Sequence, residues 1–266
     1  MVRERSVDVS GRALRYLEAG AGWPVVLLHA FPLSSDMWRP QLDQPPAGCR
    51  LLAPDLRGFG PGAGPAASSL EEMAADVLGW LDALALDQVT VGGLSMGGYV
   101  IFSLFRQAPE RFTGVILANT KAVADTPEAR AGRDKMSELV RAEGPSSIAA
   151  QMVPKLLGKT SIESRPEALA AVHRIIEGNT TEGIDGALRA IRDRPDSTDL
   201  LPGISCPALV IAGDEDVLIP VADVEAMQRG LPRSHFVVLS RSGHLSNLET
   251  PADFSTALAD FLRAHL

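Results

Sequence analysis

A serine stands in the chain where an apolar run gives way to a helical pattern. The segment Gly93-Leu94-Ser95-Met96-Gly97 has the form Gly-x-Ser-x-Gly, and it follows an apolar run that ends at Val91. A tight strand–turn–helix bend needs small neighbours, because the backbone of the serine is strained there. Such a bend would hold the Ser95 hydroxyl clear of a sheet and near the positive end of the next helix. The bare pattern is weak, but this context predicts that Ser95 is a nucleophile.

The strands that would position this serine are visible as short apolar runs. Each run is apolar at nearly every position, which is typical of strands covered on both faces. Two further segments, 7–9 and 14–18, flank Gly11-Arg12 and are predicted to form a hairpin. The six apolar runs are residues 25–28, 50–53, 88–91, 114–118, 208–212 and 236–239.

Helical patterns separate these runs. Residues 70–84 carry apolar side chains close to a 3.6-residue period, and residues 96–108 and 221–229 are also compatible with helices. The last helix is predicted to open with Thr250 as N-cap and Pro251 in its first turn. Strands that alternate with helices indicate crossover connections and a mostly parallel sheet.

Residues 123–197 break the alternation, because they contain no strand-like run. A separate helical domain is one interpretation, but the sheet pattern resumes at Ala208, so we interpret the segment as an insertion. We predict a core domain of residues 1–121 and 198–266 and a helical cap, or lid, of residues 122–197. The four helices predicted in the lid are residues 127–143, 146–157, 166–177 and 180–192.

The elbow around the serine, the strand pattern and the inserted lid resemble the α/β-hydrolase superfamily, over essentially the whole chain. The segment Gly-Leu-Ser-Met-Gly-Gly, a four-helix lid and Gly-His-Leu-Ser-Asn-Leu-Glu-x-Pro are together most similar to serine carboxylesterases related to 3-oxoadipate enol-lactonase. The resemblance implies an α/β fold, the α/β-hydrolase fold. Its mostly parallel eight-stranded sheet would be flanked by helices and would carry an inserted all-helical lid. It also implies a serine hydrolase that cleaves a carboxylic ester or lactone through an acyl-enzyme intermediate.

The resemblance also implies where the base and the acid lie. In this family the base follows the last strand, where His244 stands in a Gly-containing loop. The acid follows the penultimate strand, four residues before a proline, which favours Asp216 over Asp214 because the proline is Pro220. Asp216 would hold the second ring nitrogen of His244 and stabilise the cation that forms. Some relatives take the acid after the preceding strand, but the residues that follow Ala118 include no carboxylate.

An oxyanion needs two preorganised backbone N–H donors. Met96, directly after the nucleophile, would supply one. By the family match the other is Phe31, in the loop that follows residues 25–28. Relatives usually have glycine where Ala30 stands, so Ala30 would be strained if the site requires a positive φ.

Several other polar residues are interpreted as structural. His29 would shape its loop through a hydrogen bond, and Asp55 and Arg57 would pin loops near the site. His173 would have a surface or packing role on a lid helix, while His235 and His265 would be solvated or structural.

The substrate predicted for this site is a small, largely apolar ester or lactone beneath the lid helices. Arg130, Arg133 and Lys135 would suit an acidic substrate, but a solvated helix face is the interpretation we favour. The candidate lining residues, each also compatible with an ordinary core position, are Trp38, Leu94, Met152, Leu156 and Leu218.

Other functions remain open at this stage. The same three residues occur in relatives that act as cofactor-free haloperoxidases or perhydrolases, as C–C bond hydrolases or as thioesterases. A different class of protein, a small-molecule receptor, can use the same fold with the lid as its partner surface. An inactive scaffold is disfavoured, because Ser95, Asp216 and His244 are all chemically competent.

The composition narrows the partners. The 266 residues carry a formal net charge of −8, which argues against nucleic acid and anionic membrane surfaces. No metal or cofactor motif is present, so we expect a small-molecule ester or lactone as the partner and leave monomer and homodimer open. No apolar run approaches the roughly 18 residues of a membrane span, and no secretory signal is evident, so we expect a cytoplasmic protein. Cys49 and Cys206 are expected to be reduced and buried.

Overall fold

Eight strands form one sheet in the computed structural model, which describes residues 1–265. The strand order is β1-β2-β4-β3-β5-β6-β7-β8, with β2 antiparallel to both of its neighbours and all later pairs parallel. The predicted hairpin and the predicted mostly parallel sheet are therefore confirmed. The strands are β1 (Arg3–Val9), β2 (Arg12–Gly20), β3 (Trp23–Leu28), β4 (Cys49–Pro54), β5 (Val89–Leu94), β6 (Phe112–Ala118), β7 (Ala208–Gly213) and β8 (Ser234–Leu239).

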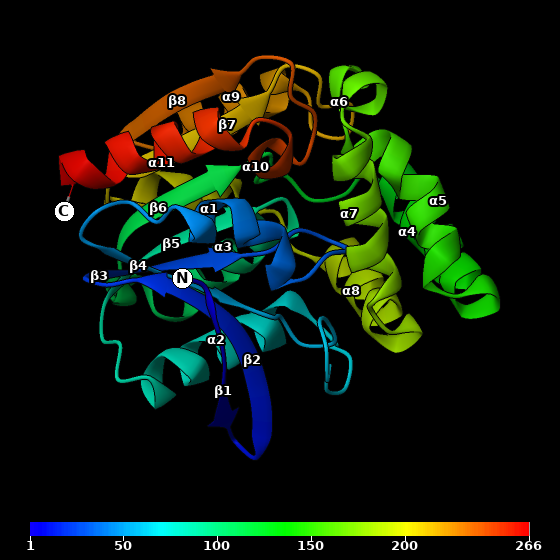
Figure 1. The fold of residues 1–266 in the computed structure, drawn as a ribbon, viewed down its shortest axis with the longest axis horizontal. Helices are drawn as coiled ribbons and strands as arrows, with labels where there is room; N and C mark the ends of the chain where they lie inside the picture. The colour runs from blue at the N-terminus through cyan, green and yellow to red at the C-terminus, as the bar shows by residue number, and fades with distance from the viewer. Residues whose placement is uncertain (266) are drawn as a thin grey trace.

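Helices flank this sheet, and the last of them, α11, runs toward the C-terminus at the left of Figure 1. The N-cap of α2 is Ser69, whose side chain accepts a hydrogen bond from the Glu72 amide. The predicted helices near residues 70, 96, 221 and 251 are all present. The flanking helices are α1 (Arg39–Asp43), α2 (Leu70–Ala83), α3 (Met96–Gln107), α9 (Val221–Arg229), α10 (Ser246–Glu249) and α11 (Pro251–His265).

Five helices follow β6 without an intervening strand and lie together beyond the carboxyl ends of the strands (Figure 1). In this group α4 packs on α8, and α5 packs on α7. The sequence predicted four of them and missed α6, which has six residues and a single apolar side chain, Ile162. We propose that the group is the cap of residues 122–197. The five helices are α4 (Pro127–Glu143), α5 (Pro145–Leu156), α6 (Lys159–Ser164), α7 (Pro166–Glu177) and α8 (Thr181–Asp193).

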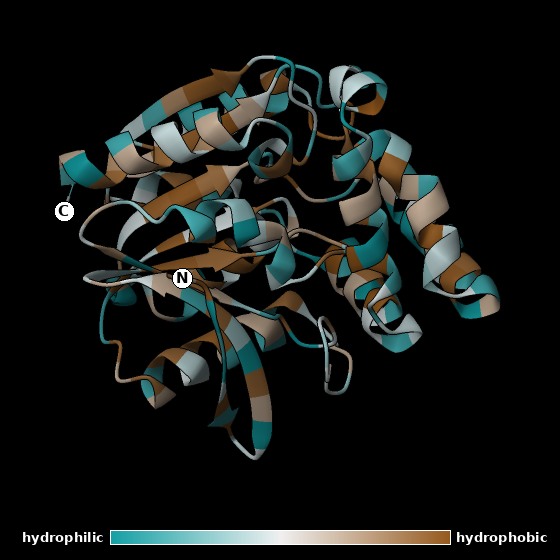
Figure 2. Cartoon of the chain, in the orientation of Figure 1, coloured by the Kyte–Doolittle hydropathy of each residue, from teal (hydrophilic) through white to brown (hydrophobic). Residues whose placement is uncertain are grey.

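The apolar core follows the central strands, which are brown along most of their length in Figure 2. All six residues of β5 are buried, as expected for a strand covered on both faces. The last strand differs from the prediction, because β8 lies at the edge of the sheet and leaves Val238 43% exposed. Of the two cysteines, both free, Cys49 is buried as expected whereas Cys206 is only half-buried.

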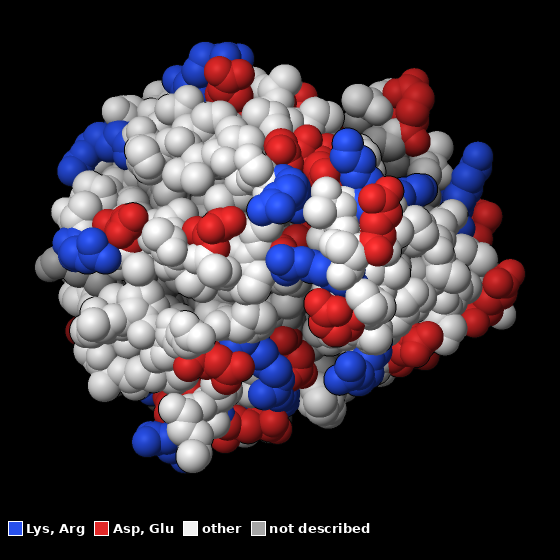
Figure 3. Space-filling model, turned by 45° about the horizontal axis from the view of Figure 1, so that its top comes forward, with Lys and Arg blue, Asp and Glu red and all other residues white. Residues whose placement is uncertain are grey.

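The surface shows no sign of a polyanion-binding face in the view of Figure 3, where acidic and basic side chains are interspersed. Within residues 1–265, no helix combines the length and the apolar character needed to cross a bilayer.

The bend between β5 and α3 depends on glycine. A Cβ atom at Gly93 would overlap the backbone of Gly97, and a Cβ atom at Gly97 would overlap the carbonyl of Leu28 at the end of β3. Because the obstructing atoms are backbone atoms, neither overlap can be relieved by a side-chain rotation. The helix can therefore begin directly after the strand only with glycine at these two positions.

We expect Gly97→Ala to destabilise the fold by about 1–3 kcal/mol, the usual cost of overpacking. Gly132→Ala is the matched control, since its Cβ on α4 meets no atom within 4 Å, and alanine in a helix is more stable than glycine by about 1 kcal/mol. Urea unfolding of the two variants and the wild type measures both effects. Equal stability of the two variants would show that the close approach of Gly97 to Leu28 does not constrain the bend.

Candidate active site

The candidate residues come from loops that follow different strands of the sheet. Phe31 follows β3, Ser95 follows β5, and Asn119 follows β6, while Asp216 and His244 follow β7 and β8. In a parallel sheet the carboxyl ends of the strands share one edge, which is where open α/β proteins bind their ligands. Residues that are far apart in sequence are thereby brought to one place.

Ser95 has a backbone conformation that is rare for a residue with a side chain. Its φ is 54° and its ψ is −112°, in the region that favours glycine. Three hydrogen bonds hold this bend. The Ser95 amide donates to the Ala118 carbonyl at 2.9 Å, and the Ser95 carbonyl accepts from the Thr120 hydroxyl and from the Gly98 amide, each at 2.9 Å. The strained backbone is what the elbow motif predicted, whereas these hydrogen bonds were not predicted from the sequence.

Asp216 and His244 form a buried pair. The Nδ1 atom of His244 lies 2.8 Å from Oδ2 of Asp216, and the two residues are only 2% and 7% exposed. The other carboxylate oxygen of Asp216 accepts the amides of Leu218 at 2.8 Å and Ile219 at 3.0 Å. Burial alone would raise the pKa of Asp216, but His244 and the hydrogen bonds outweigh it and hold that pKa below its ordinary value. Asp216 is therefore equipped to stay ionised and to orient the imidazole.

Asn119 supports this pair, and the sequence analysis missed it. Its Nδ2 atom donates to Asp216 Oδ2 at 3.0 Å and to the Gly243 carbonyl at 3.2 Å, while its Oδ1 atom accepts the Ser246 hydroxyl at 2.6 Å. The residue is fully buried. The residues directly after β6 include no carboxylate, but an amide at that position can both donate to the acid and fix the histidine loop.

The two amides predicted to bind an oxyanion belong to Phe31, in the loop after β3, and to Met96, directly after Ser95. Met96 is the first residue of α3, where helix geometry leaves N–H groups without partners. Within residues 1–265, neither the Phe31 amide nor the Met96 amide is hydrogen-bonded to an acceptor. Ala30 is not among the residues with positive φ, so the strain considered for it does not arise.

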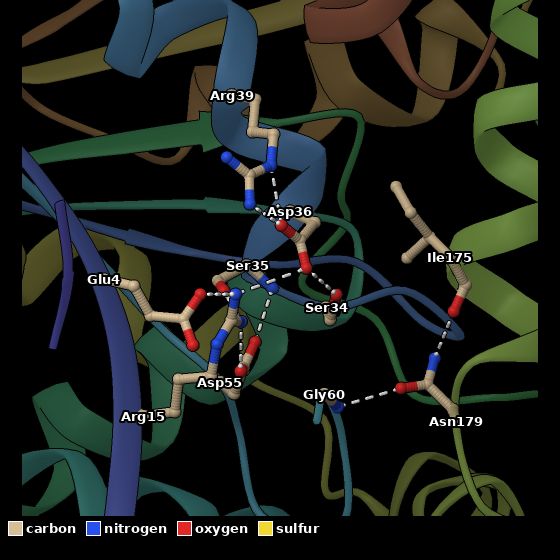
Figure 4. Close-up of polar contacts among 10 residues, drawn as sticks. All are labelled: Glu4, Arg15, Ser34, Ser35, Asp36, Arg39, Asp55, Gly60, Ile175 and Asn179. Carbon is tan, nitrogen blue, oxygen red and sulfur yellow. Dashed lines mark hydrogen bonds and ion pairs between the residues drawn. The ribbon is translucent and has the colours of Figure 1, made fainter. Parts of the chain in front are cut away.

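The loop that carries Phe31 is fastened to the core at both ends. The Leu56 amide donates to Nε2 of His29 at 3.0 Å, so Nδ1 carries the proton and donates to the Ala30 carbonyl at 3.0 Å. Burial lowers the pKa of His29 and keeps its ring neutral. At the other end the Ser35 amide donates to Asp55 at 2.7 Å (Figure 4). His29 and Asp55 therefore have the structural roles expected of them.

Arg57 also has the expected loop-pinning role. It is ion-paired with Asp76 at 2.6 Å and with Glu72, both on α2.

A cavity of about 200 Å³ lies between these loops and the lid. Five of the predicted site residues line it: Phe31, Ser95, Met152, Leu218 and His244. Five others do not. One is Asp216, which is buried against His244. The other four are apolar and almost fully buried elsewhere: Trp38, Leu94, Met96 and Leu156.

Two of those four have clear packing or bonding roles. Trp38 packs against Phe254 of α11, with ring centroids 5.8 Å apart. Leu156 accepts the Leu245 amide at 3.1 Å through its carbonyl. Trp38, Leu94 and Leu156 are thus core residues and not lining residues, and Met96 enters the predicted site only through its backbone amide.

The cavity lining also contains four charged side chains, of which only Arg133 was considered from the sequence. They are Lys121, which follows β6, Asp125, and Arg133 and Lys155 of the lid, and Tyr99 of α3 lies beside them. Of the three lid cations considered from sequence, only Arg133 faces the cavity, and Arg130 and Lys135 do not line it.

Asp125 neutralises part of this charge. It is ion-paired with Arg133 at 3.2 Å and with the buried Arg194 at 2.8 Å. Burial raises the pKa of Asp125, but the two guanidinium groups outweigh it and lower that pKa overall. Within residues 1–265, Lys121 and Lys155 form no ion pair with a carboxylate, so the cavity has a positive surplus.

Glu249 joins the histidine loop to the lid. Its carboxylate is fully buried and accepts the Leu245 amide at 3.1 Å and the Gly158 amide at 2.7 Å. Burial raises the pKa of Glu249 above its ordinary value, although the hydrogen bonds oppose this. Gly158 stands between α5 and α6, so one acidic side chain fixes both the lid and the residue next to His244.

In the part of the chain that the structure describes, no group of three or more His, Cys, Asp or Glu side chains is arranged to hold a metal ion.

Comparison with known proteins agrees with this geometry. A family model described as alpha/beta hydrolase fold matches residues 24–251. The chain is 31% identical over 249 residues to 3-oxoadipate enol-lactonase 2 of Acinetobacter baylyi, covering 92% of this chain and 91% of that protein. The chain therefore belongs to the alpha/beta hydrolase family.

Solved structures extend the likeness. The malate-bound thermophilic esterase of Thermogutta terrifontis is 37% identical, with a TM-score of 0.92, covering 99% of this chain and 100% of that chain. The enol-lactonase of Burkholderia xenovorans LB400 is 29% identical, with a TM-score of 0.89, covering 97% and 100%. The predicted fold, the family resemblance and the prediction of an enzyme of the carboxylic ester hydrolase class are confirmed.

The low pKa of Asp216 predicts a pH-dependent contribution to stability. An aspartate in the unfolded chain titrates near about 3.9, and the folded-state pKa is lower. The unfolded chain then binds more protons between the two values, so the contribution is present above the unfolded pKa and is lost as the pH falls through the folded pKa. We expect the stability advantage of the wild type over Asp216→Asn to shrink from about pH 5 to about pH 3. Urea unfolding across this range measures it, and a constant difference would contradict the assignment.

Proposed function

We propose that this hydrolase cleaves a small carboxylic ester or lactone through an acyl-enzyme intermediate on Ser95. The observation that carries the proposal is the meeting of three features at one cavity. These are the strained Ser95, the His244 ring held by Asp216 at 2.8 Å, and the Phe31 residue whose amide has no acceptor within residues 1–265. A nucleophile, an oriented base and free N–H donors are the parts that acyl transfer needs.

The first half of the reaction forms the acyl-enzyme. His244 takes the proton of the Ser95 hydroxyl through Nε2 as the oxygen attacks the acyl carbon. The negative charge moves to the carbonyl oxygen, which the amides of Phe31 and Met96 stabilise. The carbon–oxygen bond to the alcohol then breaks, and His244 returns its proton to the leaving alkoxide.

The second half releases the acid. His244 takes a proton from water as the water attacks the acyl carbon, and the resulting tetrahedral intermediate uses the same two amides. When the bond to Ser95 breaks, the proton on His244 passes to the Ser95 oxygen and restores the enzyme. Asp216 stabilises the imidazolium in both halves without itself taking the proton. For a lactone the leaving alcohol stays attached to the acyl group, so the net reaction is ring opening.

The first test compares the wild type with Ser95→Ala on p-nitrophenyl esters from acetate to octanoate. We expect a burst and steady turnover in the wild type and a loss of about 10³-fold or more in the variant. The matched control is Ser103→Ala, because Ser103 is buried on the same helix and does not line the cavity. Equally slow wild type and Ser95→Ala would overturn the proposal and favour the receptor function.

The charges of the cavity refine the predicted substrate. Its lining holds Lys121, Lys155 and Arg133 against the single carboxylate of Asp125, in a chain whose net charge is −8. A cleft with a surplus of one sign attracts ligands of the opposite sign. We therefore propose that the acyl group carries a negative charge beside its apolar part. The malate bound to the Thermogutta terrifontis esterase supports this, as does the name of the 3-oxoadipate enol-lactonase.

A pair of p-nitrophenyl esters tests the charge preference, one ending in a carboxylate and the other in a carboxamide of equal length. We expect the carboxylate ester to have a kcat/KM about two- to fivefold higher, as suits partly exposed ion pairs, and the ratio to fall with added salt. Lys121→Gln and Lys155→Gln should lower the ratio. Lys135→Gln removes the same charge from the lid outside the cavity and should leave the ratio unchanged. A ratio of one or below in the wild type would contradict the preference.

A further inference from the structure

The loop that carries Phe31 has a third attachment, and it comes from the lid. Residues Ala30 to Leu33 form a turn, closed by the Leu33 amide, which donates to the Ala30 carbonyl at 2.9 Å. Inside this turn the Pro32 carbonyl accepts a hydrogen bond from Nδ2 of Asn179 at 2.8 Å. Asn179 directly follows Gly178, the C-cap of α7. The tip of the loop is thus held by the lid, while its two ends are held by the core.

Asn179 uses all of its hydrogen-bonding groups at this junction. Its Oδ1 atom accepts the Gly60 amide at 2.9 Å, and its second Nδ2 hydrogen goes to the Ile175 carbonyl at 3.0 Å (Figure 4). The residue is only 5% exposed. Because Gly60 can only donate through its amide, and Pro32 and Ile175 can only accept through their carbonyls, the orientation of the side-chain amide is fixed by its partners.

A hydrogen bond to the Pro32 carbonyl restrains the orientation of the turn relative to the core. The Phe31 amide belongs to the same turn, and within residues 1–265 it has no hydrogen bond that would fix its direction. The direction of this amide therefore depends on the groups that hold the turn in place. These are the core contacts at His29 and Ser35 and the lid contact at Asn179.

We propose that Asn179 is a positioning residue that couples the lid to the oxyanion hole. The inference rests on the proposed function, because it assumes that the Phe31 amide stabilises the oxyanion. With Asn179 in place, the lid holds the turn so that the Phe31 N–H points at the charge that develops on the carbonyl oxygen. Without it, the donor is misaimed in the transition state, while the ester in its ground state binds nearly as before.

The test uses variants that change the acceptor and the donor of the Asn179 side chain differently. Asn179→Asp keeps an acceptor for the Gly60 amide and replaces the donor to the Pro32 and Ile175 carbonyls with an oxygen. Asn179→Ala removes all three contacts. We expect kcat on a p-nitrophenyl ester to fall about 10- to 100-fold in both variants, because misplacement of a preorganised group costs that much. KM should change less than about twofold.

A second readout isolates the oxyanion. A trifluoromethyl ketone adds to the nucleophile and places a negative oxygen in the hole, whereas the corresponding methyl ketone resembles the ground state. We expect the affinity for the trifluoromethyl ketone to fall by the same factor as kcat/KM, and the affinity for the methyl ketone to stay within about twofold.

The matched control is Thr180→Ala. Thr180 is the N-cap of α8 and its hydroxyl accepts the Gly183 amide at 3.0 Å, so its loss weakens the same corner of the lid by about 1 kcal/mol without touching the Phe31 loop. We expect this control to lower the melting temperature and to keep kcat and the ketone affinities. All variants are assayed below their measured melting temperatures, and Asn179→Gln, which keeps both a donor and an acceptor, should recover part of the lost kcat.

Two results would overturn the proposal. One is an Asn179→Asp protein with wild-type kcat and only a lower melting temperature. The other is a fall in kcat that Thr180→Ala reproduces. Failure of the proposed function is a separate outcome, since the wild type would then neither turn over the ester nor bind the trifluoromethyl ketone more tightly than Ser95→Ala does.

Discussion

The left-handed backbone of Ser95 is the constraint on which the rest of the site depends. A non-glycine residue held in such a region costs about 1–3 kcal/mol, and here three hydrogen bonds from neighbouring segments offset the cost. Two of them come from the end of β6 and the residues after it, and the glycines of the elbow allow α3 to lie against the end of β3. The bend therefore contacts the ends of β3 and β6 as well as β5, and the segments that follow those strands carry Asn119 and the two amides proposed as oxyanion donors.

Both the core and the lid contribute residues that line the cavity and hold the predicted site residues in place. The core supplies Ser95, Asp216 and His244, which we propose as nucleophile, acid and base, and the lid supplies cationic and apolar parts of the cavity wall. Several polar side chains cross the boundary, and two of them are buried beside the predicted site residues. Glu249 extends from the core to the Gly158 amide, and Asn179 extends from the lid to the Pro32 carbonyl. Both are buried, so neither bond has water as an easy substitute. The lid is thus hydrogen-bonded beside His244 and beside Phe31, which we propose as the base and as an oxyanion donor.

What the sequence could predict followed from local rules. The strands and most helices follow from the spacing of apolar residues, and the elbow follows from the small residues next to Ser95. Both signals lie within a few residues of the sequence. Asn119, Asn179 and the unpaired Lys121 have no such signal, because each gains its role from segments that lie near it only in the fold. Trp38 and Leu156 show the converse. Large apolar side chains near a predicted cavity look alike in sequence, and only packing decides which of them reach it. The missed helix α6 is too short for a periodic pattern to emerge.

The burial of Glu249 has a consequence for exchanging caps among relatives. A fully buried carboxylate whose pKa is raised by its surroundings tolerates little further loss of hydrogen bonds. A transplanted cap must therefore present a backbone N–H where Gly158 stands, and a residue with a side chain there would collide with Glu215 and Gly243. A chimera that replaces only the helices facing the cavity would lose the Gly158 hydrogen bond. The buried Glu249 carboxylate beside the histidine loop would then lack one of its donors. The joint between α5 and α6, and not the cavity wall, sets the boundary at which one cap can be replaced by another.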